Sequence, residues 1–157
     1  MLHSGDSALS TGLAVSLPTG PSYQPAAAHA RTIAQLQPFV GYLWRQGDFY
    51  LHGFLSVDVP TDAVAPTVLF NDIGVGYRLA MGGLLRAVIP TAEVHVNTPL
   101  THRSASDPER RRDSVHLTLG AHLELGERTW LSLAAATPVT RPRLFDAEAL
   151  ARLNWGF

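Results

Sequence analysis

VHLTLGAHLEL, residues 115–125, alternates without interruption between apolar side chains and polar or small ones. Its odd positions carry Val, Leu or Ala, and its even positions carry His, Thr, Gly or Glu. Successive side chains of a β-strand point to opposite faces of the sheet, whereas a helix repeats about every 3.6 residues. The stretch therefore predicts a strand with one face in an apolar medium and the other in a polar one.

The same alternation recurs along the rest of the chain, while helical periodicity is poor. The alternating segments reach or exceed the roughly 9–11 residues that a tilted strand needs to cross a bilayer. Strands of soluble proteins are usually shorter, about 5–6 residues. We expect eight strands, at residues 8–17, 32–45, 49–59, 67–79, 84–98, 114–125, 129–137 and 145–157.

The connections between these segments alternate in length. RQGD (45–48), AMGG (80–83) and GER (126–128) are short and contain Gly, as tight hairpin turns do. Long polar or Pro-rich loops lie between them, and a Pro next to a Thr precedes each loop; these are Pro18, Pro60, Pro99 and Pro138. Because short turns at one end and long loops at the other are typical of outer-membrane barrels, we predict an all-β fold, an antiparallel up-and-down transmembrane β-barrel.

Composition limits the alternatives. The 157 residues suffice for one domain, residues 1–157, and the formal net charge of −1 gives no reason to expect a nucleic-acid partner. The absence of Cys excludes disulfide frameworks, thiolate zinc sites and Cys nucleophiles. The sequence contains neither an apolar run of about 18 residues nor a signal-peptide pattern. If the protein is exported, we therefore expect this chain to be a mature form, a fragment or the product of a gene called too short.

In each segment, residues at alternate positions belong to opposite predicted faces, the apolar face and the polar face. Phe39 and Leu43 would point to the polar face unless a bulge shifts the register, and Arg86 shares the parity of Val94 unless the register shifts near Pro90. A soluble β-sandwich with its apolar face inside remains open. In a barrel, we expect nine polar-face residues to line the lumen: Asp58, Asp72, Arg78, Glu93, His95, His116, Glu124, Glu148 and Arg152.

Aromatic residues gather near the short-turn ends of the segments, which favours the membrane barrel because interfacial aromatic girdles mark such proteins. The residues of the expected girdle are Tyr42, Trp44, Tyr77, Trp130, Trp155 and Phe157. The chain ends ALARLNWGF (149–157), an alternating strand with a terminal aromatic residue. We expect Trp155 and Phe157 to form the signal that the outer-membrane assembly machinery reads.

Several polar-parity side chains are of types used in catalysis or metal binding. His116 and His122 lie on one predicted strand, roughly 20 Å apart, which is too far for a shared metal shell. Ser56, His95 and Asp58 are conceivable hydrolase residues, but no nucleophile motif such as G-x-S-x-G surrounds the serine. We therefore expect no catalytic residues, no metal and no cofactor.

Two further motifs have ordinary explanations. PERRRD (108–113) is a charge run that could meet anionic headgroups, although such runs are more often solvated loops. GVG (74–76) falls inside a predicted strand, where Gly relieves crowding, rather than in a phosphate-binding loop.

Four stretches carry a resemblance to one family: GLAVSLPTG (12–20), GFLSVDVPTD (53–62), LFNDIGVGYRL (69–79) and VIPTAEVHVNTPL (88–100). With the terminal aromatic strand, they are similar to the outer-membrane transporter family described as "MetA-pathway of phenol degradation", in particular its planctomycete-like members. The resemblance covers most of the chain and includes no catalytic signature. It implies a barrel of the bacterial outer membrane that takes up small, aromatic or hydrophobic compounds, with a signal peptide and further N-terminal strands in full-length members. The resemblance thus implies that this chain is the C-terminal part of a larger barrel.

We therefore expect passive passage of small solutes through a polar lumen. The expected partners are outer-membrane lipids, the barrel assembly machinery and a small-molecule solute. Two alternatives stay open: a non-conducting barrel for anchorage or adhesion, its lumen plugged by Arg–carboxylate pairs, and an outer-membrane hydrolase.

Overall fold

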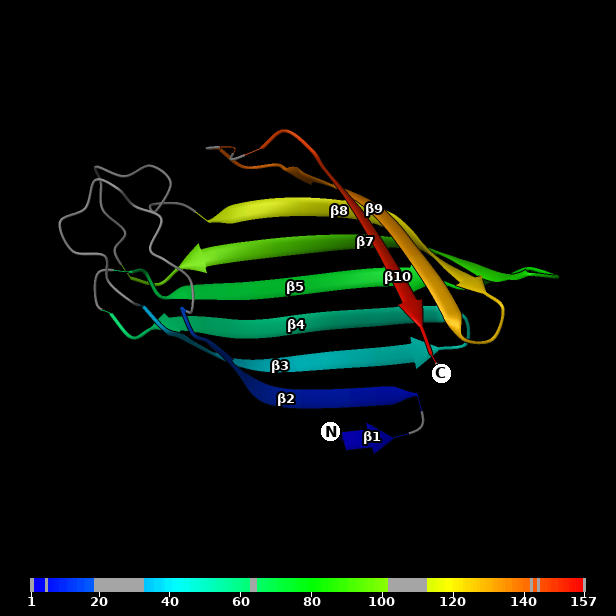
Figure 1. The fold of residues 1–157 in the computed structure, drawn as a ribbon, viewed down its shortest axis with the longest axis horizontal. Helices are drawn as coiled ribbons and strands as arrows, with labels where there is room; N and C mark the ends of the chain where they lie inside the picture. The colour runs from blue at the N-terminus through cyan, green and yellow to red at the C-terminus, as the bar shows by residue number, and fades with distance from the viewer. Residues whose placement is uncertain are drawn as a thin grey trace.

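The computed structural model describes residues 2–4, 6–18, 33–62, 65–101, 113–141, 143 and 145–156, which form one antiparallel sheet without helices (Figure 1). Its ten strands follow one another across the sheet in sequence order, except that the short β6 pairs onto β7. They are β1 (Leu2–Ser4), β2 (Ser7–Ser16), β3 (Gln35–Gln46), β4 (Phe49–Pro60), β5 (Val68–Tyr77), β6 (Leu79–Ala80), β7 (Leu85–Pro99), β8 (Ser114–Leu125), β9 (Thr129–Pro138) and β10 (Glu148–Trp155).

The prediction of an all-β antiparallel fold is confirmed. Each of the eight predicted strands is present, with ends that differ by at most a few residues, and β1 and β6 are short additions. The described residues contain no helix that could cross a membrane.

The three predicted short turns are hairpin turns, and each places a glycine in the left-handed region. The φ angles are 61° at Gly47, 75° at Gly83 and 69° at Gly126. An L-residue with a side chain is strained there, so the glycines allow the strands to reverse within a few residues. At the opposite end, β4, β7 and β9 end at Pro60, Pro99 and Pro138.

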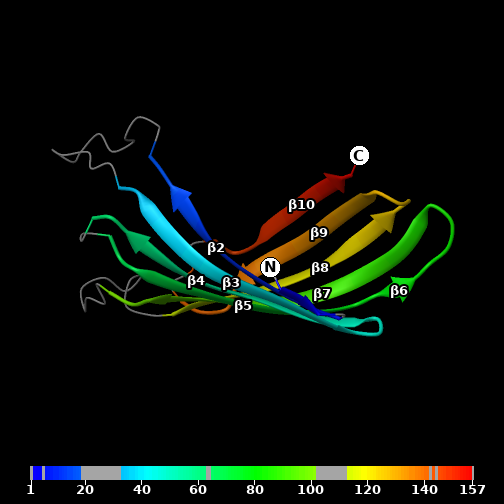
Figure 2. The same ribbon diagram turned by 90° about the horizontal axis from the view of Figure 1, so that it is seen from below.

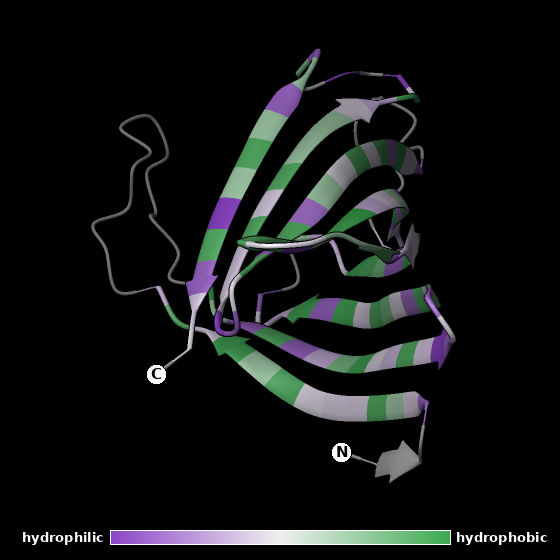
Figure 3. Cartoon of the chain, turned by 90° about the vertical axis from the view of Figure 1, so that its right-hand side faces the viewer, coloured by the Kyte–Doolittle hydropathy of each residue, from purple (hydrophilic) through white to green (hydrophobic). Residues whose placement is uncertain are grey.

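The register confirms the predicted division into two faces, because directly paired residues of antiparallel strands point to the same side. Leu119, for example, pairs with Ala92 on β7 and with Ala135 on β9. Stripes of alternating hydropathy run along the strands in Figure 3. The large side chains on this apolar face include Leu9, Leu13, Val15, Val40, Leu51, Leu55, Ile73, Val75, Val94, Leu117, Leu119, Leu131, Leu133 and Leu153.

The two irregularities that the sequence left open are resolved differently. Phe39 and Leu43 lie on the polar face, since β2 and β3 pair in continuous register, and Phe39 stacks on Phe54 with ring centroids 5.4 Å apart. The shift expected near Pro90 lies instead between Leu85 and Ala87, where β7 bulges against β8. A bulge puts an extra residue, here Arg86, outside the normal alternation.

The described sheet is a single curved layer, with β2 and β10 rising on the same side of a trough (Figure 2). Among the described hydrophobic residues only Ala87 and Ala136 are buried, while Leu119 is 66% exposed and Trp155 is 72% exposed. Soluble domains bury one face of a sheet against a second layer. Within the described residues no such layer covers the apolar face.

The sheet is also open. β10 pairs with β9, and β1 pairs with β2, but these outer strands do not pair with each other in the part of the chain that the structure describes. The closed barrel expected from the sequence therefore stays a prediction.

Candidate functional site

The concave side of the sheet carries most of the polar side chains of the strands, and we call it the polar face. Cross-strand pairing defines rows on it, each row being a set of residues that are partners from strand to strand. One row joins Phe54, Asp72, His95 and His116, and the next joins His52, Gly74, Glu93, Thr118, Ala136 and Glu148. Together these two rows bring residues from six strands into one surface.

The structure places all nine predicted lumen residues on this face. Eight of them lie in strands whose register fixes their side: Asp58, Asp72, Glu93, His95, His116, Glu124, Glu148 and Arg152. Arg78 follows β5 and reaches the same face, where it binds Glu124. Phe157 and residues 108–112 of the arginine run lie outside the described residues.

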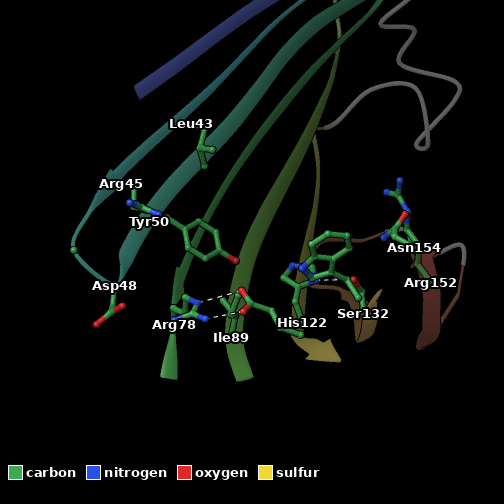
Figure 4. Close-up of a pocket in the computed structure, with 13 residues that line it drawn as sticks. Leu43, Arg45, Asp48, Tyr50, Arg78, Ile89, His122, Ser132, Arg152 and Asn154 are labelled. Atoms are coloured by element: carbon green, nitrogen blue, oxygen red, sulfur yellow. Dashed lines mark hydrogen bonds and ion pairs between the residues drawn. The ribbon is translucent and has the colours of Figure 1, made fainter. Parts of the chain in front are cut away.

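A hollow of about 800 Å³ occupies the short-turn end of the polar face. Side chains from β3, β4, β7, β8, β9 and β10 converge on it in Figure 4. Its lining combines aromatic and aliphatic groups with charged ones: Leu43, Arg45, Gly47, Asp48, Tyr50, Arg78, Ile89, His122, Glu124, Trp130, Ser132, Arg152 and Asn154. The mixture suits small solutes that have both an apolar and a polar part.

Arg78 and Glu124 form the best-defined ion pair in the hollow. The Arg78 Nε lies 3.1 Å from Glu124 Oε1, and its Nη2 lies 2.7 Å from Oε2. This fork-to-fork arrangement fixes the guanidinium plane as well as its position. The hydrogen bonds to Glu124, and then the charge of that carboxylate, raise the pKa of Arg78 above its ordinary value, so the guanidinium stays charged at physiological pH.

A second polar cluster lies in the two central rows. Nδ1 of His95 is 3.0 Å from Asp72 Oδ1, and its Nε2 is 3.0 Å from Thr118 Oγ1. Glu93 contacts two imidazoles, with Oε2 at 3.5 Å from His95 Nε2 and Oε1 at 3.7 Å from His52 Nε2. We call His52, Asp72, Glu93 and His95 the histidine–carboxylate cluster; it links β4, β5 and β7, and Thr118 extends it to β8.

Two glycines of β5 create the room for large neighbouring side chains. A Cβ on Gly74 would lie 2.5 Å from His52 Nε2 and 2.8 Å from Glu93 Cγ, so only Gly allows these two side chains to meet across β5. The ring of Tyr50 covers Gly76 in the same manner. The prediction that GVG (74–76) relieves crowding inside a strand is thus confirmed.

The conceivable hydrolase residues have other partners. His95 contacts Asp72, Glu93 and Thr118, while Ser56 is 1% exposed and accepts a hydrogen bond of 3.0 Å from Gln37 Nε2. Asp58 Oδ1 is buried without a hydrogen-bond partner among the described residues. Within those residues no group of three or more His, Asp or Glu side chains is placed to hold a metal ion.

The expected aromatic girdle is only partly on the apolar face. Tyr42, Trp44, Tyr77 and Trp155 lie there, but Trp130 pairs with Glu124 and with Asn154 and so points into the hollow. The sequence already indicated this orientation, because Trp130 lies two residues before the polar Ser132 on the same strand. The prediction that Trp130 belongs to the girdle was wrong. Thr118 was also missed as a partner of His95, although it lies two residues after His116 on β8 and therefore on the same face.

Comparison of the chain with models of known protein families, with curated proteins and with solved structures finds no match.

Proposed function

We propose that this chain forms the wall of a β-barrel in the bacterial outer membrane and that the barrel lets small solutes pass along its polar face. The observation that carries the proposal is the continuous apolar face of a single-layer sheet. Monomeric soluble proteins rarely expose contiguous apolar patches of more than a few hundred Å². Lipid chains cover such a face without any second protein layer.

The length of the strands also supports a position in a membrane. β8 has 12 residues and β7 has 15. At about 3.4 Å per residue and a tilt of about 45°, twelve residues cover about 29 Å, which matches the hydrocarbon core of about 30 Å. Trp44 and Trp155, on the apolar face near the short-turn ends, suit the membrane–water interface.

The polar face supports passage rather than simple packing. It carries acids, bases and a hollow of about 800 Å³ at one end, where charged groups stand beside Tyr50 and Trp130. A barrel of about eight strands is filled by side chains, and larger ones leave a channel, so passage requires further strands. The sequence resemblance to the outer-membrane transporter family suggests small, aromatic or hydrophobic compounds as the solutes.

A second candidate is a non-conducting barrel for anchorage or adhesion. It is favoured by the Arg78–Glu124 pair, whose 2.7 Å contact is a salt bridge on the wall of the hollow. Ion pairs of this kind can plug a narrow lumen as well as line a wide one.

Electrical recording separates these candidates. The full-length barrel that contains this chain is produced in a Gram-negative host, extracted from the outer-membrane fraction and added to planar bilayers. The proposal expects recovery in that fraction and discrete conductance steps. Recovery without conductance supports the non-conducting barrel, whereas a protein that stays soluble and monomeric without detergent contradicts both.

A further inference from the structure

The charged groups of the polar face fall into two zones with different partners. At the short-turn end Glu124 is neutralised by Arg78, which is always protonated. In the two central rows, Asp72 and Glu93 contact histidines, and no Arg of the described residues pairs with either. The charge of the central zone therefore depends on the protonation of imidazoles.

We propose that the histidine–carboxylate cluster sets the ion selectivity of the barrel and makes it depend on pH. This inference rests on the proposed function, because it names the residues that determine which ions pass. With neutral imidazoles, the two carboxylates and two histidines of the cluster carry a net charge of −2. Uptake of a proton by each imidazole brings that charge to zero, and histidine side chains titrate between about pH 5 and 8.

Both histidines of the cluster have carboxylate partners. His52 lies 3.7 Å from Glu93, and His95 lies 3.0 Å from Asp72 and 3.5 Å from Glu93. In neutral His95, Nδ1 donates to Asp72 and Nε2 accepts from the Thr118 hydroxyl; in the charged form both nitrogens donate, and the hydroxyl turns to accept. Protonation thus requires no rearrangement of the strands.

Other titratable groups lie on the polar face around the cluster, on its own strands and on β8. His116 is the direct partner of His95 on β8, and its ring lies edge-on to Phe145 with centroids 5.5 Å apart. Its protonation would change the charge in the same direction. The remaining titratable and charged groups on β4 and β8 and after β5 are Tyr50, Asp58, His122, Glu124 and Arg78.

Reversal potentials across a KCl gradient test the inference in planar bilayers. From pH 7.5 to pH 5.5 the wild-type preference for K⁺ over Cl⁻ should fall, because each unit charge removed at about 4 Å in water changes the local concentration of either ion by up to about fivefold, in opposite directions. The double variant His52→Gln/His95→Gln should lose most of this change. His122→Gln removes a histidine that lines the hollow outside the cluster, and an equal loss of the pH response in this variant would overturn the inference.

A pH-independent preference in the wild type, or an unchanged pH response in the double variant, overturns the inference while leaving passage intact. If the barrel does not conduct, the proposed function fails first, and unfolding by urea in detergent micelles tests the cluster. The pH dependence of the resistance to urea should then differ between the wild type and the double variant, because only the wild type has imidazoles beside Asp72 and Glu93. Equal responses of the wild type and the double variant would contradict the cluster's role.

Discussion

Arg78 and Glu124 are 46 residues apart in the chain, and two hydrogen bonds of 3.1 and 2.7 Å join their side chains at the edge of the hollow. The contact reaches across β7, from the end of β5 to β8, which is possible because Ala87 in the row of Glu124 has only a methyl group. It fixes one negative and one positive charge at the short-turn end of the polar face.

Removing one member of this pair should change ion selectivity in opposite directions. Glu124→Gln leaves an uncompensated guanidinium and should lower the preference for cations, whereas Arg78→Gln should raise it. One unit charge at about 4 Å in water corresponds to a change of up to about fivefold. Reversal potentials at constant pH measure the ratio, and a double variant that does not return toward the wild-type value would contradict pairing of the two side chains.

The turn between β6 and β7 offers a matched pair of glycines. A Cβ added to Gly82 or to Gly83 would meet no atom within 4 Å, but only Gly83 has a positive φ, at 75°. Gly83→Ala should therefore destabilise the protein by about 1–2 kcal/mol, while Gly82→Ala has little effect. Urea unfolding in micelles gives both values, and equal losses would argue against the left-handed conformation.

Tyr50 and Gly76 form a cross-strand pair in which the ring covers the glycine. Gly76→Ala should cost about 1–3 kcal/mol of unfolding free energy, because the added methyl displaces the ring. The same substitution in a Tyr50→Ala background should cost less, since the clash is gone. Additive effects in this double-variant cycle would show that the ring does not lie over Gly76.

The three tryptophans should report on different surroundings. Trp44 and Trp155 lie on the apolar face, and Trp130 lies in the hollow. In variants that retain a single Trp, brominated lipids should quench the fluorescence of Trp44 and Trp155, and aqueous iodide should quench that of Trp130. Quenching of Trp130 by lipid would place β9 in the opposite orientation.

The alternation of side chains was enough to predict the strands, their order and the two faces. In 115–125 every odd residue is on the apolar face, as expected, because a period of two leaves only one choice of side for each residue. The hairpin turns were equally readable, since Gly47, Gly83 and Gly126 supply the required positive φ angles.

Contacts between distant strands were not readable from the sequence. The meeting of His52 with Glu93 depends on the register of β4, β5 and β7 together, and on Gly74 between them. The bulge at Leu85/Ala87 arises from pairing of β7 with β8, which no local pattern near Pro90 encodes. Trp130 was misplaced because its chemical type was given more weight than its parity.

Leu133 and Leu150 provide the most direct test that the apolar face lies in lipid. They are 46% and 45% exposed on neighbouring strands, but Leu133 points to the apolar face and Leu150 to the polar face. Arg on the lipid face near the bilayer centre costs about 2–4 kcal/mol. The measurement is the free energy of unfolding in lipid bilayers for Leu133→Arg and Leu150→Arg; we expect a loss of that size for the first and little change for the second, and equal small effects in both would contradict a membrane-facing surface.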